Sequence, residues 1–147
     1  MITEDYVSFE TAKLLKEKGF DEEYDVVYSE YGDLHKIFDK EFYENTNSFA
    51  TISNSNYNDI TRFKYGFFVV APTLQMVMKW LREIYKLEVR ITYDYDKDSW
   101  WGNINPMFEE TDENSDSYQK ALGFDYQGKS YEEACEATIK YYLENLI

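Results

Sequence analysis

The side chains that could do chemistry in this chain are almost all carboxylates. Its 147 residues include 29 Asp and Glu, 15 Lys and Arg, one His and one Cys. Asp94, Asp96 and Asp98 match the first three ligand positions of a calcium loop. The match ends there, because Ser99 stands where that loop needs Gly and its twelfth position is Asn105 rather than a bidentate Glu. This pattern favours a polar turn at the end of a strand.

A second acidic run covers residues 109–116. Its carboxylates could bind a hard cation weakly, but such a run is typical of a solvated loop. No pair of acids stands out as the acid and base of a hydrolase. The sequence has no P-loop, no G-x-G-x-x-G and no H-E-x-x-H motif. It therefore predicts no catalytic residue, metal or cofactor, and enzymatic activity is not the favoured function.

Cys135 and His35 would have to meet to form a nucleophile and base. Cys135 projects to the middle of the apolar side of the last predicted helix, which favours a buried, inert thiol. His35 lies near a predicted hairpin turn with no companion ligand, which favours an ordinary surface or half-buried histidine.

Binding is the remaining chemistry, and two groups of residues are candidates for it. Gln75, Lys79, Arg82 and Lys86 recur on one side of a predicted helix and could hold phosphate or an acidic partner, although a solvated helix face is favoured. Trp100 and Trp101 follow Tyr93 and Tyr95, and adjacent strand residues point to opposite faces. One Trp is expected in the core and the other at solvent or a partner, with a small-molecule stacking site as the alternative. The candidate interaction surface comprises Lys79, Trp80, Arg82, Lys86, Trp100 and Trp101.

Several elements must position these groups. A helix is predicted from Ser8 to a stop at Gly19, and a hairpin from residues 24–30 and 34–38 around Gly32. Residues 45–59 are predicted as a loop with a short strand at 49–52, and 62–71 as a central strand. The clearest helix follows Pro72 and Thr73 and runs to residue 86.

The later elements are read in the same way. Apolar and polar residues alternate from 87 to 96, which predicts a strand, and residues 100–104 are its expected hairpin partner. A weaker strand is predicted at 118–125. The last helix begins with a capping box at Ser130 and Glu133 and continues to about Asn145.

This order predicts a single α+β domain over residues 1–147, with a mostly antiparallel sheet and about three helices gathered on one face. The 28 aromatic residues indicate that the chain folds despite a net charge of −14 and a mean hydropathy of −0.65. No signal-like start and no apolar stretch near ~18 residues is present, so we expect a cytoplasmic protein without a membrane span.

Three segments resemble a known family. They are residues 71–83, residues 130–137 with 142–147, and the opening residues 2–12. The chain is similar there, over about half its length, to short uncharacterised proteins encoded by gut Bacteroides genomes, their prophages and other mobile elements, whereas residues 94–129 match no pattern of that family. The resemblance implies an accessory cytoplasmic protein of mobile-element origin and transfers no catalytic residue.

These observations favour a non-enzymatic protein-interaction module that binds a host or phage protein. The alternatives are an acidic decoy that mimics DNA and a small-ligand binder or carboxylate-dependent hydrolase. Direct nucleic-acid binding is not expected, because the net charge of −14 repels phosphate. A homodimer is also expected, because the wide apolar arc of the helix at 73–86 leaves a flank of Met76, Trp80 and Leu87 that needs a cover.

Overall fold

The structure, a computed structural model, describes residues 2–36, 54, 68–107 and 116–147. It confirms the α+β class, with four helices and two antiparallel sheets of three strands each among those residues. The single sheet expected from the sequence is therefore corrected to two. The chain divides into two compact units, one of residues 6–72 and one of residues 1–5 together with 73–147. We call the second of these the C-terminal unit.

The unit of residues 6–72 begins with helix α1 (Phe9–Glu17). Ser8 Oγ accepts a hydrogen bond from the amide of Thr11 at 3.2 Å, and Gly19 adopts a left-handed φ of 85° after the helix. Both ends are where the sequence places them. Strands β1 (Val26–Ser29) and β2 (Leu34–Lys36) form the predicted hairpin.

Strand β3 (Phe68–Val70) completes the first sheet, whose order is β2-β1-β3. Its central strand among the described residues is therefore β1, in place of the segment 62–71. Residues 62–67 lie outside the described part of the chain, as do the predicted short strand at 49–52 and all of the loop 45–59 except Asn54.

The C-terminal unit contains the clearest predicted elements. Helix α3 (Leu74–Tyr85) begins at Thr73, whose Oγ1 accepts from the amide of Met76 at 3.2 Å. Lys86 follows with a left-handed φ of 58° and turns the chain directly into strand β4 (Leu87–Asp94). Strand β5 (Ser99–Pro106) returns antiparallel, in an unbroken register that runs from Leu87 opposite Pro106 to Asp94 opposite Ser99.

Residues 118–125 do not form the predicted strand. Helix α4 (Asp116–Leu122) occupies most of this segment, and strand β6 (Asp125–Gly128) begins only afterwards and pairs with β5. Lys120 Nζ lies 2.7 Å from Asp116 one turn earlier, and Ala121 is fully buried. An ion pair at that spacing and a buried small residue both favour a helical turn.

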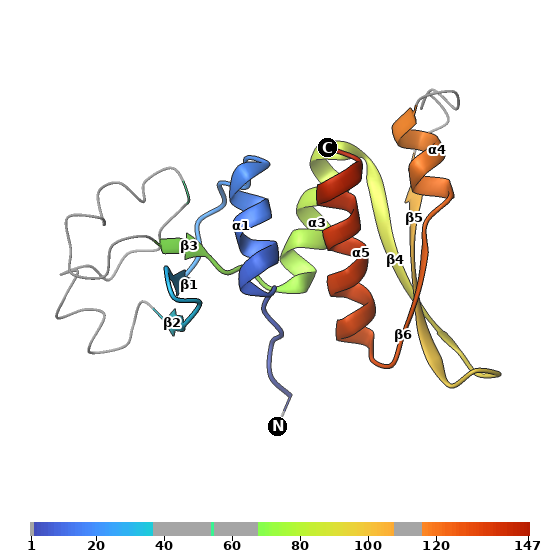
Figure 1. Ribbon diagram of the computed structural model, residues 1–147, viewed down its shortest axis with the longest axis horizontal. Helices are drawn as coiled ribbons and strands as arrows, with labels where there is room; N and C mark the ends of the chain where they lie inside the picture. The colour runs from blue at the N-terminus through green and yellow to red at the C-terminus, as the bar shows by residue number, and fades with distance from the viewer. Residues whose placement is uncertain (1, 37–53, 55–67, 108–115) are drawn as a thin grey trace, which may run out of the picture. The chain divides into compact units, whose positions relative to one another are not determined.

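Helix α5 (Tyr131–Asn145) packs against β4, β5 and β6, and α3 packs against β4 and α5 (Figure 1). The start of α5 differs in one detail from the predicted capping box. Ser130 Oγ accepts from the amide of Glu133 at 3.1 Å, but Glu133 Oε2 accepts from the amide of Lys129 at 3.1 Å rather than from that of Ser130. The inward side of α5 is buried and consists of Ala134, Cys135, Thr138, Ile139, Tyr142 and Leu143.

Candidate functional site

Four aromatic side chains form a continuous row in the C-terminal unit. Tyr93 on β4 lies opposite Trp100 on β5, with ring centroids 5.1 Å apart. Tyr95 contacts Tyr93 at 4.9 Å, and Trp100 contacts Tyr131, the first residue of α5, at 5.4 Å. All three separations fall within the range of favourable aromatic contacts, roughly 4.5–7 Å. We call Tyr95, Tyr93, Trp100 and Tyr131 the aromatic row.

Exposure increases along the aromatic row from the helix to the hairpin turn. Tyr131 and Trp100 are half-buried, Tyr93 is 37% exposed and Tyr95 is 88% exposed. Figure 1 shows the turn between β4 and β5 projecting beyond β6 and the start of α5. The row is thus anchored on the helix at one end and open to solvent at the other.

Two aspartates of the calcium-like pattern, Asp94 and Asp98, hold the turn beside this row with their side chains, and Asp96 contributes its backbone amide. Asp94 Oδ1 accepts from the amides of Asp96 at 3.0 Å and Lys97 at 3.4 Å. Asp98 accepts a hydrogen bond from the Tyr93 hydroxyl, and this bond raises the pKa of Tyr93. These contacts agree with the polar turn that the sequence favours. Within the described ranges no group of three His, Cys, Asp or Glu side chains is placed to hold a metal ion.

Trp101 occupies the face of the sheet opposite to Trp100, as the strand alternation predicts. Its Nε1 donates to Asp94 Oδ2 at 3.1 Å, and Lys97 Nζ lies 5.0 Å from its ring centroid. Both tryptophans are half-buried, so neither enters the core completely. The two rings therefore cannot form one stacking platform.

The α3 part of the predicted surface needs correction. Trp80 is only 8% exposed and contacts Tyr85, with ring centroids 5.4 Å apart, so it does not offer its ring to a partner. Ile84, on the same helix, is 59% exposed. The buried side of α3 is therefore rotated toward the flank on which the sequence placed Trp80.

The cations of that surface lie along α3 and at its end. Lys79 is exposed and lies 4.0 Å from Glu83, Arg82 is half-buried, and Lys86 caps the helix in its left-handed conformation. Gln75 at the start of the stripe donates from Nε2 to the Tyr131 hydroxyl at 2.8 Å. This bond joins α3 to the aromatic row.

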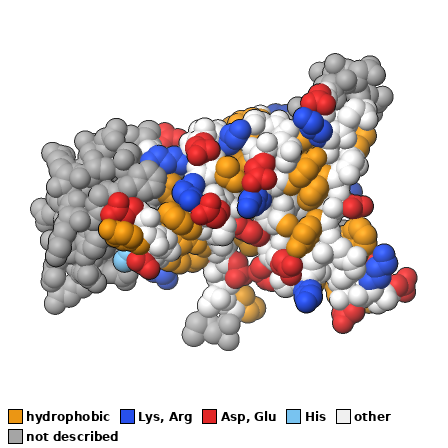
Figure 2. Space-filling view, in the orientation of Figure 1, with side chains coloured by type: hydrophobic (Ala, Val, Ile, Leu, Met, Phe, Trp, Pro, Cys, Tyr) orange, Lys and Arg blue, Asp and Glu red, His pale blue; other side chains and the backbone are white. Residues whose placement is uncertain are grey.

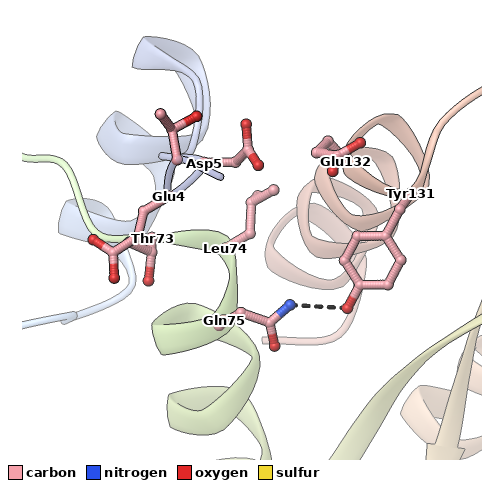
Figure 3. A pocket seen from close by; sticks show the side chains of 8 residues that line it. Glu4, Asp5, Thr73, Leu74, Gln75, Tyr131 and Glu132 are labelled. Carbon is pink, nitrogen blue, oxygen red and sulfur yellow. Dashed lines mark hydrogen bonds between the residues drawn. The ribbon is translucent and has the colours of Figure 1, made fainter. Parts of the chain in front are cut away.

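A hollow of about 240 Å³ begins at Tyr131 (Figure 3). Its walls come from the N-terminal segment and from the first residues of α3 and α5, and the amide of Leu74 donates to the Asp5 carbonyl at 2.9 Å. In Figure 3, Asp5 and Glu132 lie on either side of its upper rim. The lining residues are Thr3, Glu4, Asp5, Thr73, Leu74, Gln75, Tyr131 and Glu132.

Sequence reasoning missed Tyr131 and the acids of this hollow. Tyr131 was visible only as a residue of the last helix, because its contact with Trp100 depends on how α5 packs on β5. The pairing of β4 with β5, by contrast, was predicted from the sequence, and this pairing brings Tyr93 beside Trp100.

Cys135 is buried, as predicted, and its Sγ lies 3.8 Å from Met78 Sδ. Burial raises the pKa of this thiol to about 11, so almost none of it is thiolate at neutral pH. His35 is half-buried on β2, in the other unit.

Comparison with known proteins gives no match: no family model, no curated protein and no solved structure is similar to the chain. Over the described ranges, none of the helices has the length and apolar character needed to cross a bilayer.

Proposed function

We propose that the chain is a non-enzymatic protein-interaction module whose aromatic row docks the partner. The observation that carries this proposal is the unbroken series of four rings from half-buried Tyr131 to Tyr95 at the projecting turn. Tyr and Trp are the residues that most often dominate binding energy in protein interfaces. A row held by ring contacts loses little side-chain entropy on binding.

The shape of the row favours a macromolecular partner over a small molecule. The rings lie along a hairpin that projects from the unit, and small ligands are usually enclosed in concave sites. A projecting strip instead fits a groove or an extended segment on another protein.

The charges around the aromatic row indicate which kind of partner surface it would bind. Figure 2 shows acidic side chains, in red, around the start of α5 and at the hairpin turn. Asp96 and Asp98 flank the exposed end of the row, and Glu132 and Glu133 flank its anchored end. A partner with a neutral or basic surface is therefore favoured over an acidic one. The resemblance to mobile-element proteins adds the expectation of a host or phage protein.

The first step of the test is to identify a partner by affinity capture from the native host and mass spectrometry. The dissociation constant is then measured by calorimetry for the wild type and for Tyr95→Ser. We expect Tyr95→Ser to cost about 1–2 kcal/mol of binding energy, which is roughly a 5- to 30-fold weaker affinity.

Tyr31→Ser is the matched control, because Tyr31 is 82% exposed at the turn of the other hairpin and lies outside the row. It should bind like the wild type. Equal losses in the two variants, or no loss in Tyr95→Ser, would show that the row is not the docking surface.

The hollow supports a second candidate function, the binding of a small cationic ligand. It combines the Tyr131 ring with the carboxylates of Glu4, Asp5 and Glu132, and no Lys, Arg or His is among its lining residues. The test is titration with small aliphatic amines, read by intrinsic tryptophan fluorescence, to which Trp100 contributes from its place beside Tyr131. A saturable change that Glu132→Gln weakens and Glu144→Gln does not would support this function. The DNA-mimic hypothesis rests on net charge alone.

A further inference from the structure

The second sheet has one long edge. Its order is β4-β5-β6, so β4 pairs on one side only within the described part of the chain. Strand β4 has eight residues, no proline or glycine and no break in its register with β5, whereas the other edge strand, β6, has four residues. A long regular edge strand is a ready template for a further strand.

The register shows which backbone groups face that open edge. The amide of Met107 donates to the Lys86 carbonyl at 3.1 Å, which makes this a hydrogen-bonded pair. Because such pairs alternate along an antiparallel ladder, the even-numbered residues of β4 bond to β5. The amides and carbonyls of Leu87, Val89, Ile91 and Tyr93 therefore point to the open edge.

The exposure of the side chains along β4 differs between the two halves of this edge. Leu87 and Val89 are buried in the half of the strand that follows α3 directly. Arg90 and Thr92 are exposed, and Ile91 and Asp94 are half-buried. The half toward the hairpin turn, residues 90–94, is the accessible one.

We propose that this half-strand pairs antiparallel with the same half-strand of a second copy, with Thr92 on the two-fold axis. This register joins the outward-facing groups of Ile91 to those of Tyr93 of the second copy. It also sets Arg90 opposite Asp94 of the second copy, twice by symmetry, on the outer face of the sheet. Opposite charges in such cross-strand positions stabilise the pairing.

The two registers shifted toward the start of β4 lack this charge complementarity. An axis at Arg90 sets that cation against itself, and an axis at Ile91 sets Glu88 against Asp94 of the second copy. Like charges directly opposite each other destabilise a strand pair. The charges of the edge thus favour a second copy as the occupant, and favour this register over those two.

Disulfide trapping tests this pairing directly, in a Cys135→Ala background so that only one thiol is present. Across a non-hydrogen-bonded antiparallel pair the Cα atoms lie about 4.5 Å apart, a separation that a disulfide spans. Thr92→Cys should therefore form a covalent dimer rapidly under mild oxidation. Arg90→Cys, two residues away on the same exposed face, should not, because its two copies would lie on opposite sides of the axis.

Charge pairing at the axis gives a second measurement. Thr92→Lys and Thr92→Glu should each lower the dimer fraction seen by light scattering at 0.15 M salt, and mixing the two variants should restore it as a heterodimer. Circular dichroism checks that both variants are folded. Failure of Thr92→Cys to cross-link, equal cross-linking of Arg90→Cys, or a wild type that stays at 17.6 kDa at every concentration would overturn the proposal. None of these outcomes depends on whether the aromatic row binds a partner.

Discussion

Cys135 is a buried residue, and its effect on stability can be measured by mutation. It is fully buried, and this burial raises its pKa from the ordinary value of 9.0 to about 11. Replacing it by Ala removes one sulfur from an apolar site, so Cys135→Ala should cost of order 1 kcal/mol at neutral pH.

The same burial makes stability depend on pH in alkaline solution. Well below pH 9 the thiol is protonated in both the folded and the unfolded chain, so it adds no pH dependence there. Between pH 9 and about 11 only the unfolded chain releases the proton, which favours unfolding and lowers stability by about 2–3 kcal/mol in total. Urea denaturation at pH 8 and pH 10.5 should show a smaller drop for Cys135→Ala than for the wild type. Equal drops in the two proteins would contradict the burial.

The Tyr142 hydroxyl is a second buried group with an identifiable cost. Its ring contacts Tyr85 at a centroid distance of 6.2 Å, but its hydroxyl has no hydrogen-bond partner among the described residues. A buried hydroxyl that has lost its water partners and gained none destabilises the fold. Tyr142→Phe should therefore leave the free energy of unfolding unchanged or raise it by about 1 kcal/mol, as measured by urea denaturation. A loss greater than 1 kcal/mol would mean that the hydroxyl is hydrogen-bonded.

At the scale of elements, helix α5 approaches strand β5 closely at Gly102. A Cβ built on Gly102 would lie 2.0 Å from Thr138 Oγ1 and 3.1 Å from the Ala134 carbonyl oxygen. Gly102→Ala should therefore push α5 away from the sheet and destabilise the protein by about 1–3 kcal/mol.

A double-mutant cycle shows whether this contact is the cause. Thr138→Ala removes the nearest oxygen, so Gly102→Ala combined with Thr138→Ala should lose less stability than the sum of the two single variants. Urea midpoints at constant m-value give the comparison. Strict additivity would contradict the contact.

Elements with a strong local signal were predictable from the sequence. Ser8 and Thr73 cap their helices as their residue types require, and the alternation after Leu87 gave β4 and its hairpin. The error at residues 118–125 has a local cause as well. Its short apolar pattern suits either a strand or a helical turn. In the helix, Ala121 is buried and Lys120 lies beside Asp116.

At the scale of the whole molecule, the sequence does not predict which strands pair with one another. The strands alone do not specify whether β1 and β3 join the sheet of β4, β5 and β6, and the structure separates them into two sheets. The aromatic row shows the same limit. Its members on the hairpin were accessible to sequence reasoning, whereas Tyr131 reaches the row only through the packing of α5 on β5.

The charge of the whole chain leads to a final prediction, that added salt stabilises the fold. The net charge is −14, with five bases and 14 acids in residues 1–59, six bases and two acids in residues 60–93, and four bases and 13 acids in residues 94–147. Five ion pairs between described residues are exposed and join side chains two to four positions apart. Each such pair contributes about 0–1 kcal/mol, so screening them costs little.

Repulsion within the two acidic segments acts over longer distances and is screened more strongly. The Debye length falls from about 30 Å at 0.01 M salt to about 8 Å at 0.15 M. Raising NaCl over this range should therefore increase the free energy of unfolding by of order 1 kcal/mol, which raises Tm by roughly 4 °C for a chain of this size. Differential scanning calorimetry in NaCl measures this without the surface exclusion that sulfate adds. A Tm that falls with NaCl would mean that the exposed ion pairs contribute more than the repulsion between the acidic segments costs.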